Sequence, residues 1–237
     1  MNTSRNQIKR RSLKYCLATV AAVPLLSSLF SFTAIAAENE FAGEKVVHLL
    51  QEPRHRTVHQ DGDLYLLDVQ VNPGDTSFAH IHDQAILLTF ISRGDGPAGG
   101  SVSSNIDYAT EALTHKVSNR GPGLLRIMAM VNAGSGDQNL DSDRPDGFSA
   151  EPQLENSWFR SYKVELEPGQ ATSMKTHELA SVVVQIEDGL IHVTRDDGVT
   201  SELDEMAKWA WHSAGESYSI RNVGDVATAV VVNEGRN

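Results

Sequence analysis

The sequence predicts an all-β fold, a barrel or sandwich that occurs twice along 237 residues. Short runs rich in Val, Ile, Leu and Thr are separated by Gly, Asn and Asp turns, and no helical patterns alternate with them. With 40% hydrophobic and 22% charged residues, the composition is that of a globular protein, which excludes disordered and collagen-like chains. A gapless internal similarity indicates that one β unit is duplicated.

The individual elements follow from these patterns. A single segment, 201–211, suggests a short helix. The clearest strand patterns are the apolar, β-branched runs at 64–71, 85–91, 124–131, 182–186 and 227–232.

The internal similarity sets the expected domain organisation. The segments around Pro73 and Pro168 align without gaps at an offset of 95 residues, 168 minus 73, and His82 then falls on His177. Residues 115–121 match 218–224 at an offset of 103. We therefore expect an N-terminal barrel at 37–132, a linker loop at 133–157 and a C-terminal barrel at 158–237. The acidic run at 141–147 does not have the spacing of a calcium loop, so a solvated loop is favoured.

Residues 1–36 have the succession of a signal peptide: a basic start, an apolar stretch and a small-residue cleavage site ending at Ala36. Pro24 and several serines make an uncleaved membrane anchor the weaker interpretation. The pair Arg10-Arg11 resembles a twin-arginine signal, so general secretory and twin-arginine export both stay open. Cys16 is the single cysteine and lies in this segment. The mature protein would contain no cysteine, as suits a periplasmic or secreted location.

Charge limits the partners. Without residues 1–36 the chain has 15 basic and 31 acidic side chains, a net charge of −16. Such a surface repels phosphate backbones and anionic headgroups, so we expect neither nucleic acid nor, after signal cleavage, a membrane as partner. A small-molecule substrate or ligand is the expected partner, and a homodimer is left open.

The chemistry concentrates at His80-Ile81-His82. Successive side chains of a strand alternate between its faces, so His80 and His82 project together and can reach one ion. A third histidine, His115, precedes another strand. Imidazole suits several divalent metals, so these side chains are candidate metal ligands.

The same residues carry a family resemblance. Gly74, five residues, His80-x-His82 and then Gly94, followed by His115 ahead of Asn119, resemble the two cupin motifs. The resemblance spans both halves and implies a bicupin, two tandem cupin-like β-barrels of the double-stranded β-helix or jelly-roll type. It implies one divalent metal ion, Fe, Mn, Zn or Ni, on His80, His82 and His115.

The sequence departs from the family pattern in the first barrel. Leu87 stands where cupins often have a glutamate ligand, neighbouring Ile86 is also apolar, and Ala112 replaces the usual turn residues of the second motif. Gln84 shares the parity of His80 and His82, so its amide oxygen is a further candidate ligand.

In the second copy, the positions that correspond to the ligands hold Lys175, His177 and Tyr218. A protonated lysine repels a cation, so the second barrel is expected to be degenerate and without metal. A small acid/base site at Lys175 and Tyr218 is the alternative. The remaining histidines, His48, His55, His59, His192 and His212, show no ligand spacing, and 54–56 is expected to be a solvated basic turn.

The resulting hypothesis is an exported metal-dependent enzyme acting on a small organic molecule. Some cupin dioxygenases have three histidines and no carboxylate, so the resemblance allows a dioxygenase-type oxidoreductase. The alternative is a non-catalytic bicupin that binds or senses a small molecule. No catalytic side chain is identified beyond the metal ligands.

Overall fold

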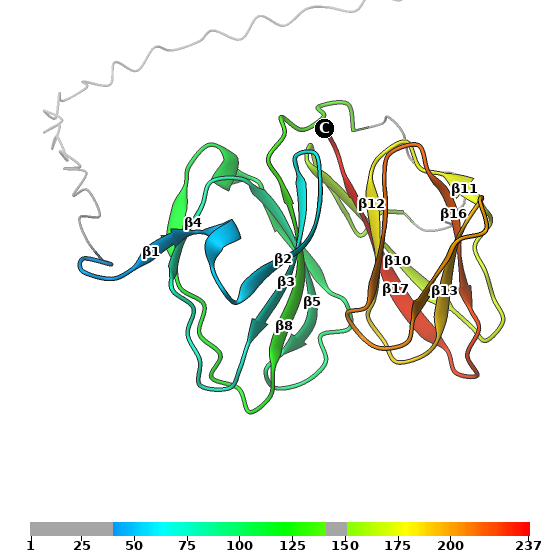
Figure 1. Ribbon diagram of the computed structural model, residues 1–237, viewed down its shortest axis with the longest axis horizontal. Coiled ribbons are helices and arrows are strands. Elements are labelled where there is room, and N and C mark those ends of the chain that lie inside the picture. Colours follow the sequence, from blue (N-terminus) through cyan, green and yellow to red (C-terminus); the bar gives the residue numbers. More distant parts are fainter. Residues whose placement is uncertain (1–39, 141–150) are drawn as a thin grey trace, which may run out of the picture. The chain divides into compact units, whose positions relative to one another are not determined.

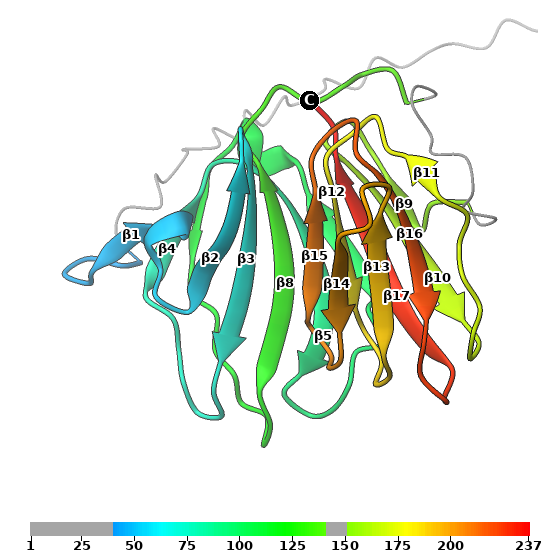
Figure 2. The ribbon, with the colours of Figure 1, turned by 45° about the vertical axis from the view of Figure 1, so that its right-hand side comes forward.

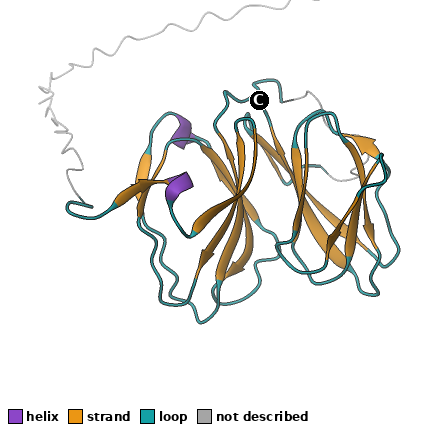
Figure 3. Ribbon diagram, in the orientation of Figure 1, coloured by secondary structure: helices purple, strands orange, loops and turns teal. Residues whose placement is uncertain are grey.

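A computed structural model describes residues 40–140 and 151–237. Strands and loops make up nearly all of this part, with two short 3-10 turns, η1 (Leu49–Gln51) and η2 (Asp107–Ala109) (Figure 3). No helix in the described ranges is long and apolar enough to cross a membrane. The predicted signal peptide and the acidic run at 141–147 lie outside the described residues, and the predicted domain boundaries stay predictions.

The N-terminal half forms two sheets (Figure 1). One has five antiparallel strands in the order β2-β3-β8-β5-β6, and the other has three in the order β1-β4-β7. The strands are β1 (Val46–His48), β2 (His55–Asp61), β3 (Leu64–Val71), β4 (Ala79–His82), β5 (Ala85–Arg93), β6 (Val102–Asn105), β7 (Leu113–His115) and β8 (Leu125–Asn132).

The C-terminal half repeats this plan beside the first (Figure 2). Its five-stranded sheet has the order β15-β12-β17-β10-β9, and its four-stranded sheet has the order β11-β16-β13-β14. The strands are β9 (Leu154–Glu155), β10 (Phe159–Leu166), β11 (Lys175–Thr176), β12 (Ser181–Gln185), β13 (Ile191–Arg195), β14 (Thr200–Leu203), β15 (Trp209–His212), β16 (Ser217–Asn222) and β17 (Thr228–Gly235).

Strand alternation divides the apolar side chains among three clusters. In β3, Leu67 and Val69 face the interior of the N-terminal barrel, whereas Leu66 faces the other half of the molecule. In β12, Val183 lies inside the C-terminal barrel and Val182 faces outward toward the first half. The large sheets are therefore buried on both faces, which is why these strands read as nearly continuous apolar runs.

The third cluster lies between the halves and joins them. It packs Leu87 and Met130 of the first half with Phe159 and Val231 of the second, and Trp209 packs against it. A buried hydrogen bond crosses the same junction, where the Asn233 amide donates to the Thr89 hydroxyl at 2.8 Å. The two barrels are thus joined by an apolar core between them, in addition to the cluster inside each barrel.

The five strand patterns identified in the sequence are confirmed by β3, β5, β8, β12 and β17. The helix expected at 201–211 is wrong: β14 ends at Leu203 and β15 begins at Trp209, with turns between them. Alternation explains the difference, because Trp209 and Trp211 pack on the cluster between the barrels while Ala210 faces the barrel interior.

The duplication is visible in one repeated turn. Gly74 and Gly169 have positive φ angles of 79° and 80°, and their amides donate to the carbonyls of Asn119 (2.9 Å) and Asn222 (3.0 Å). Each asparagine amide donates to two carbonyls, which for Asn222 are those of Leu166 (2.9 Å) and Val226 (2.8 Å). The repeated Pro-Gly and Asn positions thus close equivalent corners of the two barrels.

We expect Asn222→Ala to lower the free energy of unfolding by roughly 2–4 kcal/mol, because it removes buried hydrogen bonds and leaves carbonyls without donors. Urea unfolding of purified protein measures this. The control is Asn72→Ala, at an exposed turn position, with an expected effect of about 0.5 kcal/mol or less. Equal stability of the two variants would contradict this account of the corner.

Candidate metal centre

The register of two short strands brings the predicted ligands together. β4 pairs antiparallel with β7 so that His80 stands opposite His115, and His82 stands opposite Leu113. Directly opposed residues share a face, as do residues two apart on one strand. All three histidines therefore point to the barrel side of the small sheet, although they come from segments more than thirty residues apart.

The three imidazoles converge closely. One ring nitrogen from each of His80, His82 and His115 can be chosen so that all lie within 4.8 Å of one another. The Nε2 atoms of His82 and His115 face each other at 3.0 Å, and the three ring centroids are 4.6–5.0 Å apart. Zinc–nitrogen distances are about 2.0–2.1 Å, so nitrogens at this separation are close enough to share one ion.

The tautomer of His80 is determined by its surroundings. Its Nδ1 lies 2.9 Å from the carbonyl oxygen of Phe78, which can only accept, so Nδ1 carries the proton and donates it. Nε2 is then a lone-pair donor, and it is buried without a protein partner. In a metal-binding histidine one ring nitrogen usually donates to a protein acceptor, as Nδ1 does here, and the other is free to bind the metal, as Nε2 would be.

Burial keeps these imidazoles neutral. Desolvation, followed by the neighbouring histidines, lowers the pKa of His82 from 6.5 to about 3. The pKa of His115 is lowered to about 4, chiefly by desolvation, and that of His80 is lowered for the same first reason. Neutral imidazole is the form that binds a metal, so the cluster is ready to bind a cation at neutral pH.

A fourth histidine, His55, lies against the cluster, which the sequence did not predict. Its ring centroid is 4.5 Å from that of His80, with the rings nearly perpendicular, and desolvation first lowers its pKa to about 3. The expected solvated turn at 54–56 is thus wrong for His55, which is buried because it pairs with inward-facing Val69. A register shift between Thr57 and His59 interrupts the alternation of β2 and hides this signal in the sequence.

The residues at and beside the expected glutamate position are buried and apolar. Ile86 lies in the apolar interior of the first barrel, and Leu87 faces the core between the barrels, so neither position offers a carboxylate. The Oε1 atom of Gln84 is buried without a hydrogen-bond partner. Gln84 as a metal ligand stays a prediction.

The interior around the histidines is apolar and aromatic. Leu88, Phe90 and Tyr108 pack against its buried cluster, and the Tyr108 ring centroid is 5.0 Å from that of His82. Within residues 40–140, no lysine or arginine is buried. A cation bound by the histidines would therefore be the source of positive charge inside this barrel.

The second barrel places different side chains at the equivalent register. Lys175 stands opposite Tyr218, as His80 does opposite His115. The Tyr218 ring is stacked between His177 and His212, with centroids 4.3 and 3.9 Å away. Burial raises the pKa of the Tyr218 phenol, whose oxygen lies 3.0 Å from the Ser181 hydroxyl. Packed rings thus occupy the region that the three clustered histidines occupy in the first barrel.

Buried polar side chains of the second barrel contact one another. His177 Nδ1 lies 3.1 Å from Glu234 Oε1, and Arg160 Nη1 lies 3.4 Å from Glu234 Oε2. The cluster of potential metal ligands found in the described residues comprises His80, His82 and His115, and includes no side chain of this barrel. These contacts do not support an acid/base site at Lys175 and Tyr218, and the absence of metal from the second barrel stays a prediction.

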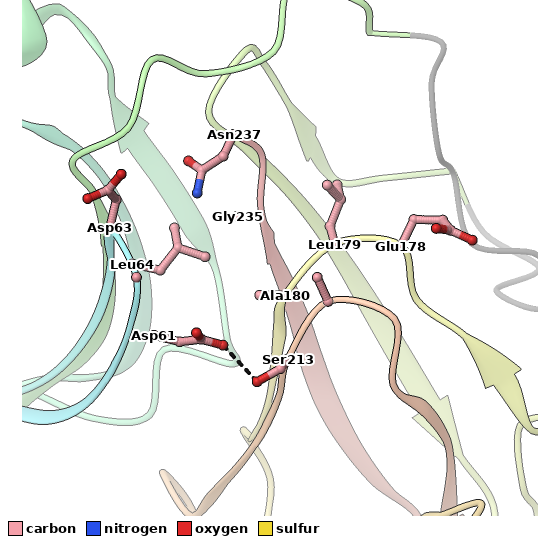
Figure 4. A pocket seen from close by; sticks show the side chains of 11 residues that line it. Asp61, Asp63, Leu64, Glu178, Leu179, Ala180, Ser213, Gly235 and Asn237 are labelled. Carbon is pink, nitrogen blue, oxygen red and sulfur yellow. Dashed lines mark hydrogen bonds between the residues drawn. The ribbon is translucent and has the colours of Figure 1, made fainter.

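A separate pocket of about 510 Å³ lies away from the histidines (Figure 4). Asp61, Asp63 and Glu178 are among its lining residues, and the Ser213 hydroxyl donates to Asp61 at 2.8 Å. None of the three clustered histidines lines this pocket.

Comparison with protein-family models and with characterised protein sequences finds no match. Solved structures do match. AerE from Microcystis aeruginosa superposes with a TM-score of 0.52 at 8% identity, over 75% of this chain and 90% of AerE. A mutant of salicylate 1,2-dioxygenase from Pseudoaminobacter salicylatoxidans, in complex with gentisate, superposes with a TM-score of 0.50 at 9% identity, over 73% of this chain and 68% of the enzyme. At this identity the likeness concerns the fold alone.

Acid should destabilise the metal-free protein through its buried histidines, and His212 of the second barrel isolates the effect. Desolvation first lowers its pKa from 6.5 to about 4, so the unfolded chain binds more protons than the folded chain between these values. Stability is thus full above about pH 6.5 and falls as the pH drops toward 4. We expect His212→Phe to reduce the loss of unfolding free energy between pH 7 and 4.5 by roughly 2–3 kcal/mol.

Chemical unfolding of chelator-treated protein at several pH values measures this difference. His192→Phe, at a half-exposed position of the same barrel, is the matched control. Parallel pH profiles for wild type and His212→Phe would show that His212 does not contribute.

Proposed function

The chain has the fold of a bicupin, and from that premise we propose that it is an exported, metal-dependent enzyme acting on a small organic molecule. The observation that carries the proposal is the convergence of His80, His82 and His115 inside one barrel, with the proton of His80 directed outward to Phe78. The donor set fits a divalent ion, because neutral imidazoles bind iron, manganese, zinc and nickel. When bound, such an ion supplies Lewis acidity and, if redox-active, a centre for oxygen chemistry.

The chain's own residues define what the site offers a substrate. Three neutral ligands leave the ion its full charge and leave coordination positions for further groups. Because no lysine or arginine is buried within residues 40–140, a substrate would be held through its own donor atoms at the metal rather than by a protein cation. Leu88, Phe90 and Tyr108 provide an apolar wall that disfavours water.

We propose a dioxygenase-type oxidoreductase within this class. The fold likeness to salicylate 1,2-dioxygenase, solved with gentisate, supports oxygen chemistry on small acids or phenols. His55 adds a titratable side chain beside the ligands, as expected of an enzyme more than of a simple binder. The signal-peptide pattern of residues 1–36 supports a periplasmic or secreted location. The charge of −16 without these residues supports small molecules as partners rather than nucleic acid or anionic membranes.

The second candidate is a bicupin that binds or senses a small molecule without turnover. The buried, unpartnered oxygen of Gln84 favours it, because an amide that closed the coordination sphere would leave no position for a reactant. Oxygen consumption separates the two candidates.

We expect His80→Ala and His82→Ala to lose stoichiometric metal while the fold persists, because two remaining imidazoles chelate weakly. Elemental analysis after desalting, with circular dichroism as the fold check, measures this. His177→Ala, in the second barrel, and His192→Ala, at a half-exposed position, should retain wild-type metal content. Wild-type protein that holds no iron, manganese, zinc or nickel after loading would refute the centre.

We expect iron- or manganese-loaded protein to consume oxygen with at least one member of a panel of small acids, phenols and thiols. His115→Ala should abolish this uptake, because it removes a ligand. An oxygen electrode provides the measurement, with the zinc-loaded protein as control. Saturable binding of a panel member without any uptake, by wild-type protein containing each metal, would support the binding module instead.

A further inference from the structure

Glu52 is a buried carboxylate that the strand patterns do not explain. Glu52 follows the 3-10 turn η1 and is only 2% exposed. Its backbone amide donates to the carbonyl of Leu49 at 3.2 Å. Burying a charged carboxylate is unfavourable unless specific partners compensate. The partners of Glu52 therefore indicate what the residue does.

Both carboxylate oxygens are directed to groups beside the metal ligands. Oε1 accepts from the amide of Phe78 at 3.2 Å, and the carbonyl of Phe78 accepts from Nδ1 of His80 at 2.9 Å. Glu52 therefore anchors the residue that determines the orientation and tautomer of His80. Oε2 accepts from the amide of Arg54 at 2.5 Å and lies 3.7 Å from Nδ1 of His55, whose ring stands against His80.

The other buried carboxylates of the described residues have different partners. Asp68 is bonded to Arg56 and Arg126, and Glu234 is bonded to His177 and Arg160. Neither contacts the three-histidine cluster. The Arg54 guanidinium, about one quarter exposed, is 3.6 Å from Oε1, so it balances the Glu52 charge only in part.

We infer that Glu52 is a positioning residue of the metal centre. The three candidate ligands include no carboxylate, and Glu52 supplies one behind them, where it contacts the groups that hold the histidines. It holds Phe78 in place for His80, fixes the chain at His55, and places a negative charge near a divalent cation held by three neutral ligands. Groups that orient ligands from behind typically contribute 10- to 100-fold to metal affinity. The inference rests on the proposed metal centre.

The test compares three variants of the full-length mature protein. Glu52→Gln removes the charge and keeps the size, Glu52→Asp keeps the charge on a shorter side chain, and Asp68→Asn alters an equally buried carboxylate away from the histidines. Zinc affinity is measured by competition with a chromogenic chelator, and the visible spectrum of the cobalt(II)-loaded protein reports the geometry of the ligands. Thermal melting of each chelator-treated variant records stability separately.

We expect Glu52→Gln to weaken zinc binding 10- to 100-fold and to shift the cobalt spectrum. Glu52→Asp should recover part of the affinity, and Asp68→Asn should lower the melting temperature without changing affinity or spectrum. Wild-type affinity and spectrum in Glu52→Gln would overturn the inference and leave the metal centre intact. Equal losses of affinity in Glu52→Gln and Asp68→Asn would also overturn it, because they would show general destabilisation. A wild-type protein that binds neither zinc nor cobalt would instead remove the proposed function itself.

Discussion

The pairing of β4 with β7 is the constraint on which the site depends. In this register His80 faces His115, and alternation along β4 adds His82 on the same side. A slip of one residue would turn one strand's histidines to the opposite face. The short sheet is in turn held by corners such as the one where Asn119 bonds three backbone groups. Ordinary sheet geometry thus places donor atoms without any special backbone strain.

The second barrel has the same scaffold with other side chains at the positions of His80 and His115. Its five-stranded sheet has the same strand order as that of the first barrel, yet Tyr218 fills its interior as a ring stacked between two histidines. Its large sheet covers the outer face of the sheet that forms the first barrel's wall. Different side chains at the positions of His80 and His115 are compatible with retention of the barrel, because burying that wall requires only apolar shape.

Electrostatics link the first barrel's chemistry to its packing. Burial in this interior lowers the pKa of each of His80, His82 and His115 and so keeps their lone pairs available for a cation. The same interior would penalise an unpaired carboxylate, and Glu52 is tolerated because amides of Arg54 and Phe78 bond it. A glutamate ligand supplies both a donor atom and a negative charge. Here neutral imidazoles supply the donor atoms in the interior, and the Glu52 carboxylate lies behind them.

The sequence by itself determined the strands and the grouping of His80, His82 and His115, because alternation and motif spacing are local properties of the chain. Only the tertiary structure placed His55 and Glu52 beside this cluster. Both depend on which strand pairs with which and on the register shift in β2, and these are properties of contacts distant in sequence. The same reason explains the wrong helix at 201–211, since Trp209 and Trp211 have a strand's spacing that is satisfied only when the other barrel covers them.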